Sequence, residues 1–88
     1  MLTANQCRAA RALLDISQSE LARLAGVSLS TVSDFETGWR AARGRAKVSD
    51  EMATRLRAAL ENAGVELIDE NGGGVGVRLR KRDRGRRS

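Results

Sequence analysis

The sequence predicts a mainly α-helical domain of four helices, followed by a β-hairpin. Three observations lead to this expectation. Four segments within the first 64 residues combine a polar N-cap with apolar residues at steps of three and four. Two short runs after Gly64 show the period-2 alternation of strands. The six residues between those runs, 69–74, are all typical of turns.

The first predicted helix covers residues 4–14. Thr3 and Gln6 have the spacing of a capping box, in which each side chain binds the backbone N–H of the other residue. Asp15 follows the helix where many helices have glycine, and Asp tolerates the left-handed conformation better than most residues. Cys7 has two interpretations: a small, partly buried apolar residue, or a redox or covalent site. The predicted apolar stripe consists of Ala9, Ala10, Leu13 and Leu14.

Two shorter helices are predicted at 18–25 and 29–37, joined by a tight turn. Gly26 stands in that turn, where a positive φ angle costs glycine nothing. Ser28 can cap the second helix through its hydroxyl group. The second helix has two large apolar residues, spaced so that both face the first helix: Val32 and Phe35.

A longer helix is predicted at 50–63, after a basic segment that has no helical period. Gly64 ends it, and its apolar stripe consists of Met52, Leu56, Ala59, Leu60 and Ala63. The hairpin strands are expected at 65–68 and 75–80. Residues 81–88 contain no apolar residue, and the sequence predicts a disordered tail there.

The composition of the 88-residue chain excludes several classes of function. It has one cysteine and no histidine, which excludes a usual zinc site and most general-base or triad schemes. We therefore expect no enzyme activity, no metal and no cofactor. No apolar run approaches the roughly 18 residues of a membrane span, and the first residues do not form a signal peptide. These features, with the lone cysteine, predict a cytoplasmic protein without a membrane partner.

Positive charge is concentrated in two segments. The net charge is +5, yet residues 40–47 hold four bases and no acid, and residues 78–88 hold seven bases and one acid. Such clustering is expected of a nucleic-acid-binding protein. Two alternatives stay open, because the first segment could be a solvated loop and the second could serve only solubility.

Residues 3–64 resemble the helix-turn-helix of phage repressors and Cro proteins, the Xre family. The resemblance rests on SQSELARLAGVS at 17–28 and STVSDFETG at 30–38. It implies a lambda-repressor-like domain whose helix 29–37 enters the major groove of double-stranded DNA. The base-reading residues would be Leu29, Ser30, Thr31, Ser33 and Asp34. Phosphate contacts would come from Gln18 and Ser28, and from the loop bases Arg40, Arg43, Arg45 and Lys47.

The resemblance also implies a buried ion pair between Arg11 and Glu36, although Arg11 could instead be a solvated charge. The sequence departs from the family in three places. Leu29 replaces a polar base-reading residue of many relatives; it cannot hydrogen-bond a base edge but can touch a thymine methyl. Asp34 is an acid on a helix that faces phosphates. The hairpin stands where the family has a fifth helix, so the family's usual dimer surface is not carried over to this chain.

Together these observations predict a sequence-specific bacterial or phage transcription regulator, acting as a dimeric repressor on a palindromic operator. A dimer is expected because one reading helix reaches too few base pairs to discriminate among genomic sites. The expected organisation is a DNA-binding domain at 1–64, a hairpin at 65–80 and a basic tail at 81–88. The candidate dimer element is the hairpin, through Val65, Leu67, Val75, Val77 and Leu79, unless the hairpin packs on its own helices.

A second hypothesis treats the same fold as a protein-interaction module. Antitoxins and anti-activators reuse this architecture, and the acidic segment 48–77 with its hairpin could bind a protein partner. DNA binding would then be secondary.

Overall fold

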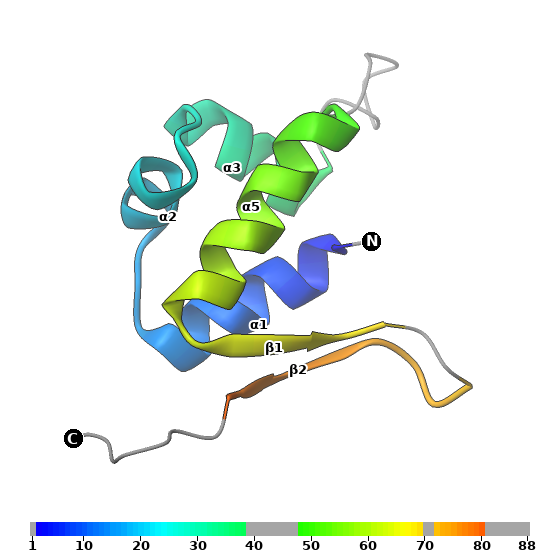
Figure 1. The fold of residues 1–88 in the computed structure, drawn as a ribbon. Coiled ribbons are helices and arrows are strands. Elements are labelled where there is room, and N and C mark those ends of the chain that lie inside the picture. The colour runs from blue at the N-terminus through cyan, green and yellow to red at the C-terminus, as the bar shows by residue number, and fades with distance from the viewer. Residues whose placement is uncertain (1, 39–47, 70–71, 81–88) are drawn as a thin grey trace, which may run out of the picture.

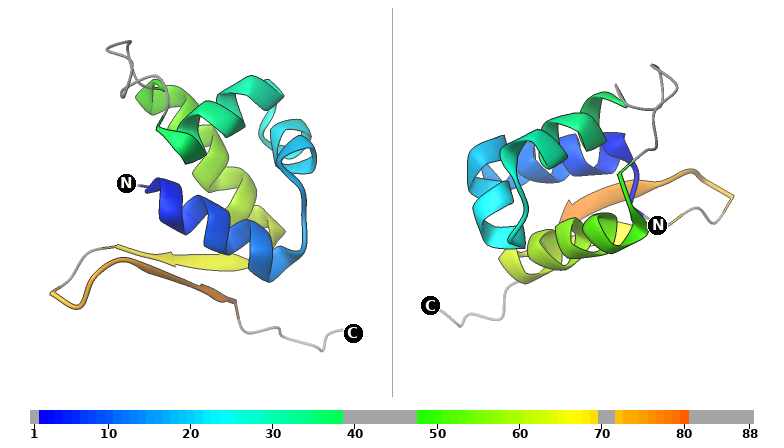
Figure 2. Two further views of the ribbon diagram at one scale, coloured as in Figure 1. Left: turned by 180° about the vertical axis from the view of Figure 1, so that it is seen from behind. Right: turned by 90° about the horizontal axis from the view of Figure 1, so that it is seen from above.

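The computed structural model describes residues 2–38, 48–69 and 72–80, and within them four helices precede an antiparallel hairpin. The elements are α1 (Ala4–Leu14), α2 (Gln18–Ala25), α3 (Leu29–Thr37), α5 (Asp50–Ala63), β1 (Val65–Ile68) and β2 (Gly76–Leu79). Figures 1 and 2 show α1 between α3 on one side and the hairpin on the other, and α5 crosses α1 in the view of Figure 1. The predicted fold class is therefore confirmed. The second strand is one residue shorter at each end than predicted.

Local side-chain chemistry sets the ends of the helices. The Thr3 hydroxyl accepts from the Gln6 backbone N–H, and the Gln6 side chain accepts from the Thr3 backbone N–H, which completes the predicted capping box. Asp15 ends α1 in the left-handed region at φ 58°. The other described helices are capped by serine hydroxyls that each accept a backbone N–H: Ser17, Ser28 and Ser49.

The core lies where all four described helices meet. Its largest fully buried apolar side chains are Leu21, Val32, Leu56, Leu60 and Val65. Within α5, the predicted Leu56, Ala59 and Leu60 are buried, but Met52 is half-buried and Ala63 is exposed. Ala63 is exposed because α5 ends there and the chain turns into β1.

The predicted apolar stripe of α1 was wrong in part. Ala10 is buried, but Ala9 is exposed and Leu13 is 43% exposed. The face of α1 that enters the protein instead carries Gln6 and Cys7, of which Gln6 is polar. A stripe of apolar residues does not mark this face, because α1 also packs against the hairpin and the Gln6 amide binds carbonyl groups there.

The hairpin packs on α1 and α5 of its own chain. Val65 of β1 is 1% exposed, and its register partner is Leu79 of β2. The buried side-chain amide of Gln6 joins the far end of the hairpin to α1. Its Nε2 donates to the carbonyl oxygens of Ile68 at 3.0 Å and Gly76 at 2.9 Å, which are register partners. The hairpin therefore shares the core of the helices.

Candidate nucleic-acid interface

The turn between α2 and α3 has the geometry of a helix-turn-helix. Gly26 caps α2 in the left-handed conformation at φ 70°, as the sequence predicted. The Val27 backbone N–H then donates to the Ala22 carbonyl at 3.0 Å, which closes the turn. Ala22 is 5% exposed, so its small side chain permits the close approach of the neighbouring elements. As a result α3 leaves the turn in a fixed direction.

One side of α3 is anchored in the core, and its first turn is exposed. Val32 is completely buried and Phe35 is half-buried against the same cluster. The predicted base-reading residues differ in exposure: Leu29 and Ser30 are exposed, whereas Thr31, Ser33 and Asp34 are half-buried. The first turn therefore offers Leu29 and Ser30 most fully to a partner.

The hydroxyl groups at the start of α3 are occupied with one another. Ser28 Oγ accepts the backbone N–H of Thr31 at 3.1 Å and lies 2.8 Å from Thr31 Oγ1. Ser28 is exposed and Thr31 is half-buried. Because this cap fixes both side chains, it also fixes the backbone of the first turn of α3.

The buried Glu36 carboxylate, 3% exposed, joins α3 to α1 and α2. Arg11 Nε donates to Glu36 Oε2 at 2.7 Å and Arg11 Nη2 to Oε1 at 2.8 Å, so the pair is bidentate. Gln18 Nε2 donates to Oε1 at 3.0 Å, and Cys7 Sγ donates to Oε2 at 3.1 Å. We call these four residues, Cys7, Arg11, Gln18 and Glu36, the Glu36 hub.

The hub is extended by two contacts to backbone carbonyl groups. Arg11 Nη1 donates to the Ile16 carbonyl at 3.2 Å, between α1 and α2. Arg8 donates from α1 to the carbonyl of Glu36 itself, in the last turn of α3, a turn that has no base of its own. A cation at a helix C-terminus is favourable for the helix dipole. Sequence reasoning missed Arg8, because its partner is a backbone atom that no side-chain motif reveals.

The electrostatics of the hub follow from burial and hydrogen bonding. Burial by itself raises the pKa of the Glu36 carboxyl group, but hydrogen bonds from Arg11, Gln18 and Cys7 outweigh it, and the pKa lies below its usual value. The hydrogen bond between Arg11 and Glu36 also raises the pKa of the Arg11 guanidinium. Burial, followed by the bond to Glu36, raises the pKa of the Cys7 thiol. A buried thiol of this kind is a poor nucleophile, so the hub uses Cys7 as a hydrogen-bond donor.

The predicted phosphate-binding residues fall into two groups. The side chain of Gln18 is half-buried and bonded to Glu36, and Ser28 caps α3 as described above. The loop bases Arg40, Arg43, Arg45 and Lys47 lie outside the described residues, as does the tail 81–88. A further base, Arg55 of α5, donates to the Gly26 carbonyl at 3.4 Å and so reaches the helix-turn-helix turn.

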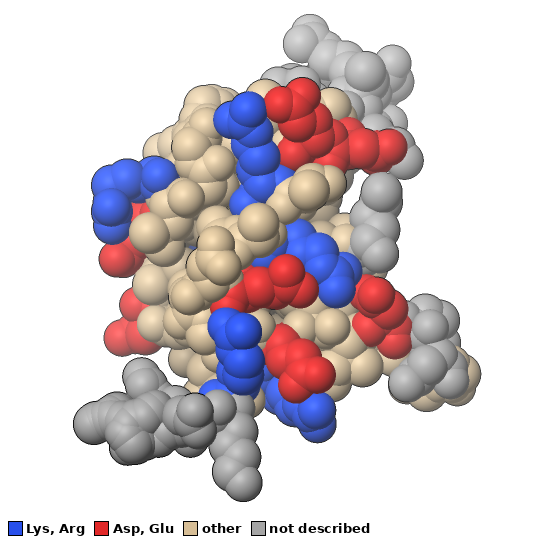
Figure 3. Space-filling model, in the orientation of Figure 1, with Lys and Arg blue, Asp and Glu red and all other residues tan. Residues whose placement is uncertain are grey.

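Bases and acids are intermixed on the face that α5 and the hairpin present (Figure 3). Its described ion pairs are Arg55–Glu51 at 3.1 Å, Arg57–Glu61 at 3.1 Å, Arg57–Asp69 at 3.0 Å and Arg78–Glu66 at 2.8 Å. Positive charge on this face is therefore matched locally by carboxylates. Among the described residues, this face carries no patch of a single sign that would attract DNA phosphates.

The five hairpin residues named for a dimer interface are not equally available. Val65 and Leu67 are buried in the core of their own chain, and Val77 is half-buried against it. Val75 and Leu79 are 42% and 54% exposed. Only these last two therefore present large apolar side chains to another molecule.

The outer edge of β2 can be derived from the hydrogen bonds of the hairpin. The Arg80 backbone N–H donates to the Gly64 carbonyl at 2.8 Å, so these two residues form a hydrogen-bonded pair. Such pairs alternate along an antiparallel ladder. Val77 and Leu79 therefore direct their backbone N–H and C=O groups away from β1, at the edge of the described two-stranded sheet.

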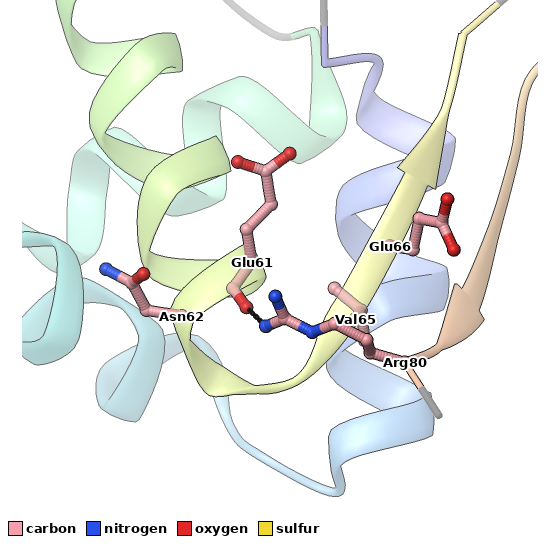
Figure 4. A pocket seen from close by; sticks show the side chains of 5 residues that line it. All are labelled: Glu61, Asn62, Val65, Glu66 and Arg80. Carbon is pink, nitrogen blue, oxygen red and sulfur yellow. Dashed lines mark hydrogen bonds between the residues drawn. The ribbon is translucent and has the colours of Figure 1, made fainter. Parts of the chain in front are cut away.

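A shallow hollow lies beside the junction of α5 and β1 (Figure 4). It is lined by Glu61, Asn62, Val65, Glu66 and Arg80. The Arg80 side chain turns inward and donates to the Glu61 carbonyl. The hydrogen bond and charge of Arg78 lower the pKa of the Glu66 carboxyl group. Arg78 and Glu66 form an ordinary surface ion pair, so the hollow gives no reason to propose catalysis.

Comparison with known proteins agrees with this geometry. A family model described as helix-turn-helix matches residues 8–62, which takes in α2, α3 and most of α1 and α5. No curated protein matches the chain. No helix within the described residues is long and apolar enough to cross a membrane. Members of the matched family bind DNA and are not enzymes. The chain belongs to the phage-repressor and Cro type of helix-turn-helix family and is a DNA-binding regulator.

Proposed function

We propose that this protein is a sequence-specific regulator of transcription that binds double-stranded DNA as a homodimer and represses. The observation that carries the proposal is the arrangement of α3, whose first turn is exposed while Val32 and Glu36 hold its other side. A helix presented in this way fits the major groove of B-DNA. Repression is the proposed outcome because occupancy of a promoter site is sufficient for it.

The Glu36 hub supports sequence-specific reading because it holds α3 against two other helices. A reading helix discriminates between bases only when its side chains keep a fixed position relative to the DNA backbone. Glu36 lies in the last turn of α3, and the Ser28 cap lies at the first, so both ends of α3 are held. Base contacts are proposed for Leu29, Ser30, Thr31, Ser33 and Asp34.

Phosphate binding is proposed for the basic residues that flank α3 in the sequence. The four bases of segment 40–47 directly follow the helix-turn-helix, and no acid lies among them. The described charges on α5 and the hairpin are matched by acids, so the attraction to DNA is assigned to this segment. Gln18 and Ser28, at the N-termini of α2 and α3, are proposed to add backbone contacts.

Dimer formation is assigned to the outer edge of β2. Open strand edges pair readily with another strand, and the exposed Leu79 lies on this strand. Val65 and Leu67 are left out of the proposed interface, because they fill the core of their own chain. Two copies would present two α3 helices to the half-sites of a palindrome.

The test of DNA reading is selection of bound duplexes from random DNA, followed by binding measurements on variants. Ser30→Ala is expected to change the preferred bases, because Ser30 is an exposed residue of the reading turn. Arg43→Ala is expected to weaken all sequences about equally and to reduce the slope of log affinity against log salt by about one contact, near 0.9. Glu61→Gln, in the last turn of α5, serves as the control and should change neither property, since its partner Arg57 keeps its ion pair with Asp69. If no sequence is enriched, the proposal is wrong and the protein-interaction hypothesis gains support.

The dimer is tested separately by analytical ultracentrifugation without DNA. Leu79→Lys is expected to shift the protein toward monomer, because it places a charge on the proposed strand edge. Ala58→Lys, which adds the same charge at an exposed position of α5, is the control. A truncation after Gly64 is unsuitable, since it would remove Val65 and Leu67 from the core. A wild-type protein that sediments as a monomer at tens of micromolar would rule out the dimer.

A further inference from the structure

The exposed apolar residue at the start of the reading helix has no place in the core. Leu29 is the first residue of α3 and is 48% exposed, whereas the other large apolar residues of this helix face inward. Exposed leucines are common on protein surfaces, so exposure alone proves nothing. Its position matters more, because the first turn of α3 is the part proposed to enter the major groove.

The neighbours of Leu29 make it the dominant side chain of this turn. The hydroxyl groups of Ser28 and Thr31 are bonded to each other at 2.8 Å, and Ser28 also caps the helix. These bonds hold both hydroxyl groups close to the start of the helix, although one of the two hydroxyl hydrogens is not used by them. Leu29 and Ser30 therefore project from the first turn as the exposed pair, one apolar and one small and polar.

The chemistry of the major groove limits what a leucine can contact there. The base edges present hydrogen-bond donors and acceptors, which lose hydration against a leucine and gain no bond in return. The one apolar group in the major groove is the methyl at C5 of a pyrimidine. Leucine also loses less side-chain entropy on burial than the long polar side chains do.

We propose that Leu29 reads the 5-methyl group of a pyrimidine in the major groove. The inference rests on the proposed function, because it specifies what the same helix recognises. Thymine and 5-methylcytosine present this methyl group in the same place, so the two sources are separated by experiment. The contact favours a methylated pyrimidine over the same base without the methyl, which is a form of discrimination that hydrogen bonds do not provide.

The test uses the duplex enriched by selection and changes single methyl groups. Each thymine is replaced in turn by deoxyuracil, which removes the methyl and leaves every hydrogen-bonding group in place. Where selection favours cytosine, 5-methylcytosine is substituted instead. For wild-type protein we expect one position per half-site at which loss of the methyl weakens binding about fourfold, and gain of the methyl strengthens it about as much.

The protein variants decide whether Leu29 is the reader. With Leu29→Ala the methyl effect at that position is expected to fall below twofold, while duplexes with and without methyl still bind. Leu24→Ala is a matched control, because Leu24 is 45% exposed but lies on α2, and this variant should keep the full effect. Thermal melting checks that both variants fold.

The outcomes separate this inference from the proposed function. If an enriched duplex is bound but no position shows a Leu29-dependent methyl effect, the assignment of Leu29 is overturned and specific DNA binding stands. If no duplex is enriched at all, both are overturned. A deoxyuracil effect identifies thymine as the source of the methyl, and a 5-methylcytosine effect identifies methylated DNA.

Discussion

Substitution of Glu36 by glutamine tests whether the hub holds the fold together. The carboxylate receives hydrogen bonds from three side chains, and its partner Arg11 is only 20% exposed. Glutamine has the same shape but only one acceptor oxygen, and its amide group would face donors. The guanidinium of Arg11 would then keep its charge in a mostly buried place without a counter-ion.

The expected size follows from measurements on buried ion pairs that lose one partner. Such changes cost about 3–5 kcal/mol, and we take about 3 kcal/mol because Arg11 keeps some contact with water. A domain of this size has a total stability of roughly 4–13 kcal/mol. A loss of 3 kcal/mol should lower the melting temperature by about 12–24 °C.

The assay is urea unfolding followed by far-UV circular dichroism, with the free energy of unfolding extrapolated to water. Glu51→Gln is the control, because Glu51 forms an ion pair with Arg55 in which both side chains are largely exposed. Such pairs contribute at most about 1 kcal/mol, and often nothing measurable. A loss below about 1 kcal/mol for Glu36→Gln, or one equal to that of the control, would refute the argument that the hub anchors α3.

Four further predictions concern other features of the fold. The pKa of Glu36 is lower in the folded state than in the unfolded state. Its contribution to the free energy of unfolding is therefore fully present above the unfolded pKa, about 4.3, and is lost as the pH falls through the folded pKa. Urea unfolding between pH 2 and 7 should therefore show a shallower acid loss in Glu36→Gln than in wild type, and equal slopes would contradict this. Gln6→Leu should lower the free energy of unfolding by about 1–3 kcal/mol, because it removes the hydrogen bonds to Ile68 and Gly76. Hydrogen exchange should become faster at the hairpin amides than at those of α5, and equally faster exchange at both would argue against a local role of Gln6 in holding the hairpin. Gly26→Ala should cost about 1–2 kcal/mol from backbone strain alone, since the nearest atom to an added Cβ, of Arg55, lies 4.0 Å away; a neutral change in thermal melting would be inconsistent with the positive φ. Cys7 should react with iodoacetamide only at the rate of unfolding, and fast labelling of the native protein would show that the thiol is accessible.

The helices and their ends could be predicted because their signals are local. The capping box at Thr3, the left-handed residue Asp15 and the glycine of the turn each depend on chemistry within a few residues. The period-2 runs likewise identified the hairpin. Each of these signals lies within a short segment of the chain, so a single sequence is enough to reveal it.

The inward face of α1 could not be predicted, because distant residues decide it. Gln6 is buried where its amide meets carbonyl groups 62 and 70 residues away in the sequence. Apolar periodicity marks Leu13 as a core residue, yet Leu13 is exposed. The pattern assumes one apolar partner surface, whereas α1 contacts helices on one side and strand carbonyl groups on the other.

The candidate site likewise has some features that local sequence signals reveal and others that depend on distant contacts. The positions of α2, α3 and their turn follow from spacing, and the pair of Arg11 with Glu36 was suggested by the family resemblance. The thiol of Cys7 as a third donor to Glu36 was not foreseen, since no motif joins a cysteine to a carboxylate 29 residues away. Such contacts become visible only once the helices are placed in space.

The contacts on α1 also imply an order in which the chain assembles. Those that hold α3 span 25 to 29 residues, whereas those that hold the hairpin span 62 and 70. Longer loops cost more entropy to close, so we expect the three N-terminal helices to associate first and the hairpin to dock last. Because docking also buries Val65 and Leu67, the step completed last closes the core. During synthesis, the reading helix would thus take shape early but gain its full stability only after the hairpin leaves the ribosome.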